Sequence, residues 1–282
     1  MKKHKYKSLF LLFAFTLLLL NVFGQQASTL HSVVSGKGKT SIIFLPGFGC
    51  SGKVWDETVQ QLASGYSCHV ITFPGFAGEP AAGDANLKDW EDAVAAYITS
   101  HKLGQVILIG HSIGGGMAMS IAADHPELVK QITVVDALPC LAVVFNPAFK
   151  ASENPDCSPF VNQFTAMSDT QLHKMQQQVV PTLVADTSRQ AAVIDWTMKS
   201  DRKTMGRIYC QFSNRDLREK IAQIKCPSLI LLEANFKDND AIMQQQYAKL
   251  LNKTLAYSTK GLHFIMYDDK GWYFEQLGSF LQ

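Results

Sequence analysis

The sequence predicts an α/β fold with a mostly parallel central sheet flanked by helices. Short apolar runs that end at Gly or Pro alternate along the chain with segments whose apolar residues recur at helical spacing. Such alternation is typical of parallel strands joined by crossover helices. The stretch 141–204 breaks the alternation because it contains no convincing strand, and we expect a helical insert there.

Six runs have the length and composition of buried strands. They occupy residues 41–45, 68–73, 106–109, 132–135, 229–232 and 255–257. Helices are predicted at residues 54–63, 87–99, 114–123 and 271–281, the last of them capped by Asp268 or Asp269. The small residues of 114–123 indicate a helix that packs close to the sheet.

The insert at about 141–204 is too long for a simple connection and is predicted to be a helical cap subdomain. Ser168 and Gln171 form a capping-box pattern at the start of a helix that should stop at Pro181, and a second helix is expected at 187–199. Large apolar side chains of a cap more often form its own core than a substrate wall. Those in question are Phe149, Phe160, Phe164, Met167, Met175, Trp196 and Met198. Any that face the site would favour an apolar acyl or ring group.

The formal net charge of +2 originates at the N-terminus. Residues 1–24 hold four lysines and no acid, so their removal changes 26 basic and 24 acidic residues to 22 and 24, a net charge of −2. A chain so close to neutrality offers no basic face for nucleic acid and no strong field for membrane steering.

The N-terminus has the pattern of a signal peptide. Residues 9–20 follow the lysines and are apolar except for Thr16. This run is shorter than the roughly 18–20 residues that a transmembrane helix needs, although an uncleaved anchor is the alternative. We expect a signal peptide at 1–24, a single domain at 25–282 without a membrane span, and export to the periplasm or the medium.

Six cysteines would enter an oxidising compartment on export and become candidates for disulfides. They are Cys50, Cys68, Cys140, Cys157, Cys210 and Cys226. Their pairing does not follow from the sequence. There is no Cys-x-x-Cys, so a zinc site or a thioredoxin-type redox site has little support. No metal and no cofactor is expected.

Residues 47–53 read Gly-Phe-Gly-Cys-Ser-Gly-Lys, which satisfies a dinucleotide signature and most of a phosphate loop. The phosphate loop needs a hydroxyl after the lysine to bind the metal, and Val54 has none. The dinucleotide site needs an acid about 20 residues further on to hold the ribose, and the next strand ends instead in Thr72-Phe73. These departures disfavour nucleotide binding.

Residues 110–114, Gly-His-Ser-Ile-Gly, lie between the predicted strand 106–109 and the small-residue helix. In that setting Gly-x-Ser-x-Gly is a nucleophile elbow, whose tight turn lifts the serine hydroxyl above the sheet at the start of a helix. An ordinary glycine-rich turn is the alternative.

A serine nucleophile needs a base. Among the eight histidines, His263 stands apart because it follows the last predicted strand, at the edge where such sheets bind ligands.

These pieces resemble the α/β-hydrolase fold superfamily over about residues 30–282. Residues 44–49 are similar to its oxyanion loop, 73–78 to its next glycine-rich turn, 110–114 to its nucleophile elbow, 225–232 to the strand before its acid, and 261–263 to its histidine loop. The resemblance implies that Ser112 is the nucleophile and His263 the general base. It also implies an oxyanion hole made by the backbone N–H groups of Phe48 and Ile113, and a cap inserted after the sixth family strand.

The acid of the triad departs from the family pattern, because Asn235 stands where the usual aspartate is expected. A longer loop would present Asp238 or Asp240 instead. Asp136, at the end of the strand 132–135, is the third candidate, and we favour it because a strand end is a stiffer support than a loop.

The function expected from these residues is an exported serine hydrolase of carboxylic esters, acting on a small and partly apolar substrate. Hydrolysis of amides, thioesters or carbon–carbon bonds is an alternative. A ligand-binding protein with negligible turnover is another, and the uncertain acid keeps it open. The sequence does not indicate an oligomeric state.

Overall fold

The computed structural model of the chain describes residues 30–282. The signal peptide predicted at 1–24 lies outside these residues. Their sheet has the strand order β1-β3-β2-β4-β5-β6-β7, and every neighbouring pair is parallel except β1 with β3. The strands are β1 (His31–Ser35), β2 (Thr40–Leu45), β3 (Tyr66–Thr72), β4 (Val106–His111), β5 (Val129–Val135), β6 (Ser228–Leu232) and β7 (Lys253–Tyr257).

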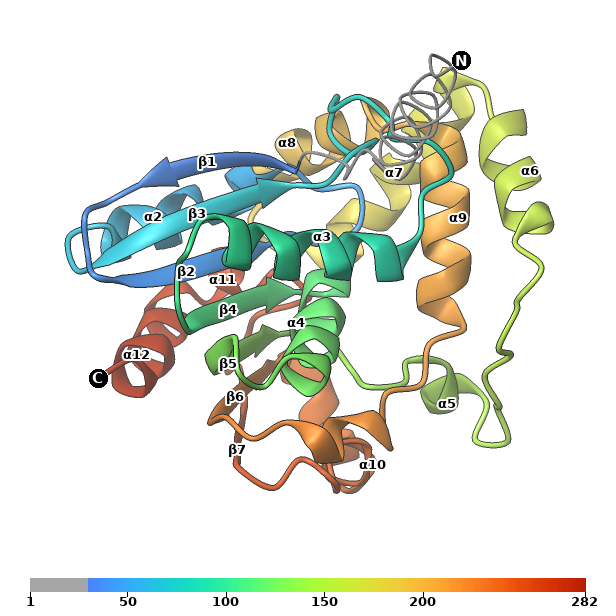
Figure 1. Cartoon of the computed structure of the whole chain (residues 1–282). Coiled ribbons are helices and arrows are strands. Elements are labelled where there is room, and N and C mark those ends of the chain that lie inside the picture. Colours follow the sequence, from blue (N-terminus) through green and yellow to red (C-terminus); the bar gives the residue numbers. More distant parts are fainter. Residues whose placement is uncertain (1–29) are drawn as a thin grey trace, which may run out of the picture.

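Helices cover both faces of the sheet (Figure 1). Outside the cap they are η1 (Gly52–Trp55), α2 (Asp56–Leu62), α3 (Leu87–Ser100), α4 (Ile113–Asp124), η2 (Lys220–Gln223), η3 (Ala234–Asn239), α10 (Asp240–Gln246), α11 (Ile265–Asp268) and α12 (Lys270–Phe280). The prediction of a mostly parallel sheet flanked by helices is therefore confirmed.

Alternate strand residues face two separate cores, because successive side chains of a strand point to opposite faces of the sheet. In β2, Ile43 and Leu45 pack into the core that contains α3 and α4. Ile42 and Phe44 face the other core, together with Trp55 and residues of α12. Strands that are buried on both faces read as continuous apolar runs, which is why the sequence made them recognisable.

Strand β1 is the one strand of residues 30–282 that the sequence analysis did not predict. It pairs antiparallel with β3 at the edge of the sheet. Its Val33 and Val34 are 57% and 52% exposed, so the segment lacks the buried apolar run of the central strands.

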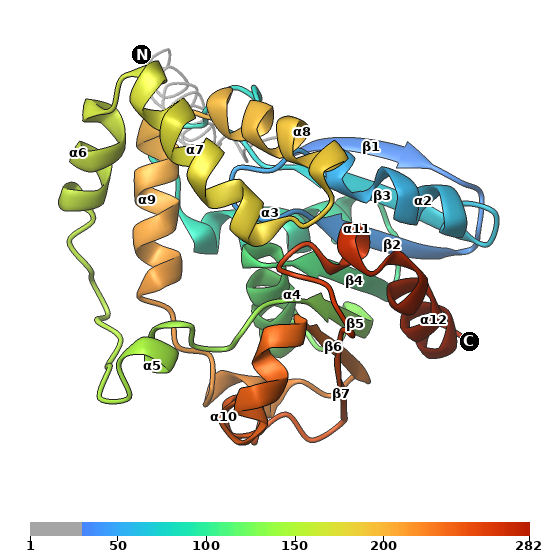
Figure 2. The same cartoon turned by 180° about the vertical axis from the view of Figure 1, so that it is seen from behind.

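The cap consists of helices between β5 and β6: α5 (Ala142–Phe145), α6 (Ser158–Ala166), α7 (Asp169–Leu183), α8 (Thr187–Met198) and α9 (Arg202–Ser213). Figure 2 shows α6 to α9 grouped at one end of the sheet. The predicted boundary at 204 falls inside α9, so the helical segment extends to Ser213. Thr204 and Met205 lie in one amphipathic helix that buries them, and the helix continues until Asn214.

Two finer predictions about helix ends were wrong. The capping box of Ser168 and Gln171 is present, but α7 continues through Pro181 to Leu183. A proline in a helix removes the hydrogen bond of its own N–H and crowds the carbonyl four residues before it. At Pro181 this disturbance falls in the last turn, and the helix ends two residues later. Neither Asp268 nor Asp269 caps α12 with its side chain. The Asp269 carboxylate accepts hydrogen bonds from Ser258 and Thr259, and the Asp268 carboxylate accepts the N–H groups of Asp186 and Leu262.

One disulfide forms among the described residues, between Cys157 and Cys210. It joins the residue before α6 to α9. The other four cysteines, Cys50, Cys68, Cys140 and Cys226, are buried free thiols. None of the helices in the described part of the chain is long and apolar enough to cross a membrane.

Candidate active site

Ser112 lies in a sharp turn between β4 and α4. Its backbone has φ 54° and ψ −122°, a conformation that L-residues rarely adopt. The serine is the residue before the first helical position of α4, where backbone N–H groups have no partner within the helix. The turn therefore holds the side chain beside a set of free N–H donors.

The glycines around Ser112 are required by close approaches of the backbone. A Cβ at Gly110 would lie 2.2 Å from the carbonyl oxygen of Gly114, and a Cβ at Gly114 would lie 2.3 Å from the carbonyl oxygen of Leu45. A Cβ at Gly115 would lie 2.8 Å from the Cβ of Ala137. The small residues thus allow α4 to begin directly against the ends of β2 and β5.

The predicted oxyanion loop lies against this turn. A Cβ at Gly47 would be 2.7 Å from Nδ1 of His111 and 3.4 Å from Cβ of Ser112. Phe48 follows Gly47 in the chain, and Ile113 is the first residue of α4. The two residues predicted to supply the oxyanion hole therefore lie on segments that meet at Ser112.

His263 and Asp136 are in direct contact. Nδ1 of His263 lies 2.6 Å from Oδ2 of Asp136, and the side chains are 22% and 3% exposed. The other carboxylate oxygen, Oδ1, accepts the backbone N–H of Glu233 at 2.7 Å. A carboxylate accepts hydrogen bonds, so His263 carries its proton on Nδ1 and its Nε2 is left free to accept one.

The other two candidate acids lie elsewhere. Asp238 and Asp240 are both exposed. Asp240 accepts a hydrogen bond from the hydroxyl of Tyr257 at 2.5 Å and one from Gln244 at 3.2 Å. Asn235, at the family's usual acid position, is exposed as well. Of the aspartates that the sequence analysis considered, the structure brings Asp136 to His263.

The histidine loop is held against the elbow through His111. The ring centroids of His111 and His263 are 4.5 Å apart, and Nε2 of His111 lies 3.0 Å from the backbone oxygen of His263. No hydrogen bond joins the Ser112 hydroxyl to His263 within residues 30–282. Such bonds are often long in unliganded enzymes and tighten when substrate binds.

Glu233 is a second carboxylate near the pair that sequence reasoning missed. It follows β6 and is half-buried. Burial raises the pKa of its carboxyl, and the negative charge of Asp136 raises that pKa further. Its position directly after a predicted parallel strand was the available signal, because side chains at these strand ends gather at one edge of the sheet.

Aromatic side chains from the cap surround Phe48. Its ring lies 5.7 Å from that of Tyr209 in α9 and 6.3 Å from that of Phe164 in α6, measured between centroids. The ring of Phe76, in the turn that follows β3, lies 5.3 Å from that of Phe48. Tyr209 is 42% exposed. The cap thus presents partly open apolar surface beside the oxyanion loop.

Residues 47–53 do not form a phosphate cradle. The N–H of Gly52 donates to Oγ1 of Thr72 at 2.9 Å, and the N–H of Cys50 donates to the carbonyl of Gly47. A Cβ at Gly52 would lie 2.6 Å from the side chain of Val70, so this glycine serves packing. The described residues also contain no group of three His, Cys, Asp or Glu side chains arranged to hold a metal ion.

Comparison with known proteins identifies the relatives of this chain. A sequence model of the alpha/beta hydrolase family matches residues 42–276. A pimeloyl-[acyl-carrier protein] methyl ester esterase from Pectobacterium carotovorum is 27% identical over 272 residues, covering 90% of this chain and 99% of that protein. An esterase of the same name from Vibrio atlanticus is 24% identical and covers 83% of this chain and 88% of its own length.

Solved structures show the same fold. An enol-lactonase from Burkholderia xenovorans superposes with a TM-score of 0.73 at 15% identity, covering 89% of this chain and 96% of that one. A hydrolase from Oleispira antarctica gives a TM-score of 0.73 at 18% identity, covering 92% and 96%.

Proposed function

Because the chain belongs to the alpha/beta hydrolase family, we propose that it hydrolyses carboxylic esters through an acyl-enzyme formed on Ser112. The family and the curated relatives make it an esterase-type hydrolase. The observation that carries the assignment of roles is the contact between His263 and Asp136 beside the strained turn of Ser112.

In the proposed mechanism His263 acts twice. Its free Nε2 takes the proton of the Ser112 hydroxyl as the oxygen attacks the ester carbonyl, and it then gives that proton to the leaving alcohol. Water repeats the sequence on the acyl-enzyme and releases the acid. Asp136 keeps the proton on Nδ1 of His263 and stabilises the imidazolium that forms at each transfer.

The developing oxyanion is proposed to accept hydrogen bonds from the N–H groups of Phe48 and Ile113. Each such donor is worth about 2.7–4 kcal/mol of transition-state stabilisation. The N-terminus of α4 adds its positive dipole at the same point.

The buried contact of Asp136 weakens the alternative of a binding protein without turnover, since that alternative depended on a missing acid. Amide, thioester and carbon–carbon hydrolysis use the same groups, so they differ from ester hydrolysis in the substrate and not in this machinery.

The proposed substrate is a small ester with an apolar acyl group. Phe48, Phe164 and Tyr209 supply apolar surface beside the proposed oxyanion hole. The curated relatives are named for a methyl ester of an acyl chain on a carrier protein. We also propose that this chain is exported. In that case its substrate would be an ester that is not attached to a carrier protein.

The test combines labelling and turnover. Wild type and Ser112→Ala are treated with a fluorophosphonate probe and assayed on p-nitrophenyl esters of increasing acyl length. We expect labelling and turnover only with Ser112, and a kcat/KM that rises from acetate to medium-chain esters. Absence of Ser112-dependent labelling and turnover from the wild type would refute the proposed function.

A further inference from the structure

We infer that His111 is a positioning residue, whose Nε2–H holds the backbone of His263 and thereby keeps the general base against the nucleophile elbow. This inference rests on the proposed function, and it assigns a role to a residue that the mechanism above does not use. His111 is the last residue of β4 and directly precedes Ser112.

The contact fixes the tautomer of His111. Nε2 lies 3.0 Å from the backbone oxygen of His263, and a carbonyl oxygen only accepts, so Nε2 carries the hydrogen. Nδ1 is then an acceptor. It is buried and has no hydrogen-bond partner among the described residues. Burial and the neighbouring His263 hold the pKa of His111 well below its usual range, and the ring stays neutral.

Stability alone does not favour a histidine at this position. The side chain is buried against the rings of Phe264, at 4.5 Å, and Trp55, at 6.5 Å, between centroids. A phenylalanine would fill such a space without burying an unpaired acceptor, which costs free energy. The gain from a histidine is the donor at Nε2.

The Nε2–H group of His111 binds the backbone carbonyl of His263, the proposed general base. Asp136 fixes one nitrogen of the His263 ring, but the ring also moves with its own backbone. Neighbouring residues of the loop are held by other contacts, from Leu262 N–H to Asp268 and from Phe264 N–H to the Leu183 carbonyl. The His263 carbonyl itself is held by His111. A misplacement of about 1 Å costs about 10²-fold in rate.

Two amide substitutions of His111 test whether a hydrogen-bond donor is needed at the position of Nε2. The side-chain nitrogen of glutamine reaches the position of Nε2, whereas that of asparagine ends near Nδ1. We expect His111→Asn and His111→Phe to lower kcat by about 10²-fold with little change in KM. His111→Gln should recover most of that loss.

A matched control comes from His69, another buried histidine. It lies in β3 and its ring bonds to Tyr97 and Ser67. His69→Phe should lower the melting temperature without lowering the kcat of the folded protein. Thermal unfolding of all variants gives the folded fraction to which kcat is normalised.

The outcomes separate this inference from the proposed function. Wild-type kcat in His111→Asn and His111→Phe would overturn the inference, and so would an equal loss in His111→Gln and His111→Phe. Wild-type turnover that does not depend on Ser112 would instead overturn the proposed function, and the inference with it.

Discussion

Two residues of the site have backbone conformations that L-residues rarely adopt. Ser112 has φ 54° and Asp136 has φ 48°, and each such residue costs about 1–3 kcal/mol. They stand at the ends of the neighbouring strands β4 and β5. The N–H of Ser112 donates to the carbonyl of Val135, and the N–H of Asp136 donates to that of Leu231. Bonds between strands thus hold both strained residues in place.

The role of Asp136 is testable by a substitution that keeps its shape. Asp136→Asn should lower kcat/KM by about 10⁴-fold, because an amide fails to keep the proton on Nδ1 of His263 or to stabilise its imidazolium. Asp240→Asn, at the exposed start of α10, is the control and should retain the wild-type value. A loss in Asp240→Asn with full turnover in Asp136→Asn would reverse the assignment.

Glu233 makes stability depend on pH in a defined direction. Its pKa in the folded protein is raised above the ordinary value of 4.5, so the native state binds this proton more tightly than the unfolded state. The contribution to stability is present below pH 4.5 and is lost as pH rises through the folded-state pKa. The Glu233→Gln variant has no carboxyl at this position and does not lose this contribution. The melting temperature of the variant minus that of wild type should therefore increase as the pH rises above 4.5. A constant difference across that range would contradict the prediction.

At the scale of elements, α6 and α9 form the part of the cap that meets the proposed oxyanion loop at Phe48. A Cβ at Gly206 in α9 would lie 2.6 Å from the Cα of Val161 in α6, so glycine allows close packing of the two helices. The disulfide of Cys157 and Cys210 joins them covalently. Phe164 and Tyr209 therefore lie on two helices that are closely packed and joined by a disulfide.

Removing the disulfide should weaken both stability and substrate binding. The double variant Cys157→Ser/Cys210→Ser should lose about 2–4 kcal/mol of unfolding free energy in denaturant titrations. We expect its KM for medium-chain esters to rise more than its kcat falls, because the cap surface loosens. A reductant should shift the wild-type midpoint and leave the variant unchanged. Equal midpoints for wild type and variant without reductant would refute the role.

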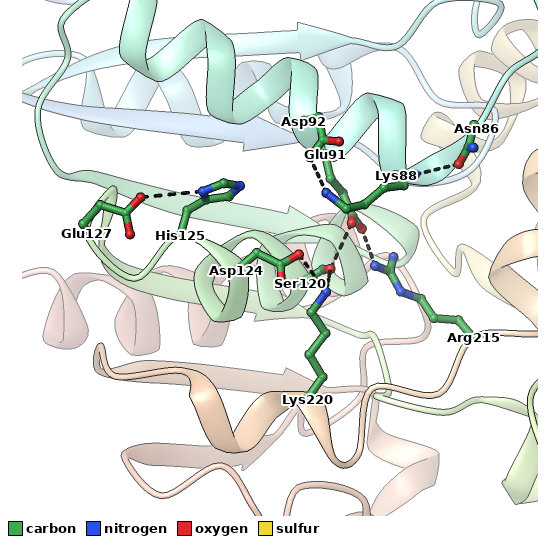
Figure 3. Close-up of polar contacts among 10 residues, drawn as sticks. All are labelled: Asn86, Lys88, Glu91, Asp92, Ser120, Asp124, His125, Glu127, Arg215 and Lys220. Carbon is green, nitrogen blue, oxygen red and sulfur yellow. Dashed lines mark hydrogen bonds and ion pairs between the residues drawn. The ribbon is translucent and has the colours of Figure 1, made fainter. Parts of the chain in front are cut away.

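A buried polar network joins the cap's return segment to the body of the protein. Arg215, just after α9, pairs with Glu91 of α3, and the side chains are 14% and 4% exposed. Figure 3 shows Ser120 of α4 bonded to the same carboxylate and to Lys220. The network links α3, α4 and η2 to the segment after α9.

Breaking this pair on one side should be costly. Glu91→Gln leaves the Arg215 guanidinium buried without its counter-charge, and we expect a loss of about 3–5 kcal/mol in unfolding free energy. Lys88 and Asp92, also drawn in Figure 3, offer a matched exposed pair on the same helix. Asp92→Asn should change stability by at most about 0.5 kcal/mol. Similar losses in the two variants would show that burial does not govern the effect.

For the molecule as a whole, we propose that it works outside the cytoplasm. The lysines and apolar run at 1–20 favour export, and a disulfide within the cap is typical of an oxidising space. If residues 1–24 are removed, the net charge of the working protein is −2 instead of +2.

Export predicts a defined N-terminus. The full chain, expressed in a bacterial host and recovered from the periplasm or medium, should begin near Gln25 in intact-mass measurements. Leu18→Arg interrupts the apolar run and should leave an uncleaved precursor inside the cell. Recovery of the wild type as a full-length cytoplasmic protein would refute the prediction.

Local patterns in the sequence determined six of the strands, most helices and the turn at Ser112. They also showed that His263 follows the last strand. Apolar periodicity and glycine spacing act between near neighbours, so they can be read along the chain. Strand β1 was not predicted because Val33 and Val34 are exposed, so the segment has no buried apolar run. Its position also depends on its pairing with β3.

Contacts between distant residues were decided only by the tertiary structure. Asp136 and His263 are 127 positions apart, and the sequence left three aspartates open because spacing along the chain does not tell which carboxylate the fold brings to the base. The cysteine pairing and the contact of His111 with the histidine loop also join distant residues. The two contacts of the histidine loop depend on which strand ends the parallel sheet brings to one edge, and those strands are far apart in the sequence. The disulfide depends instead on the packing of α9 against α6.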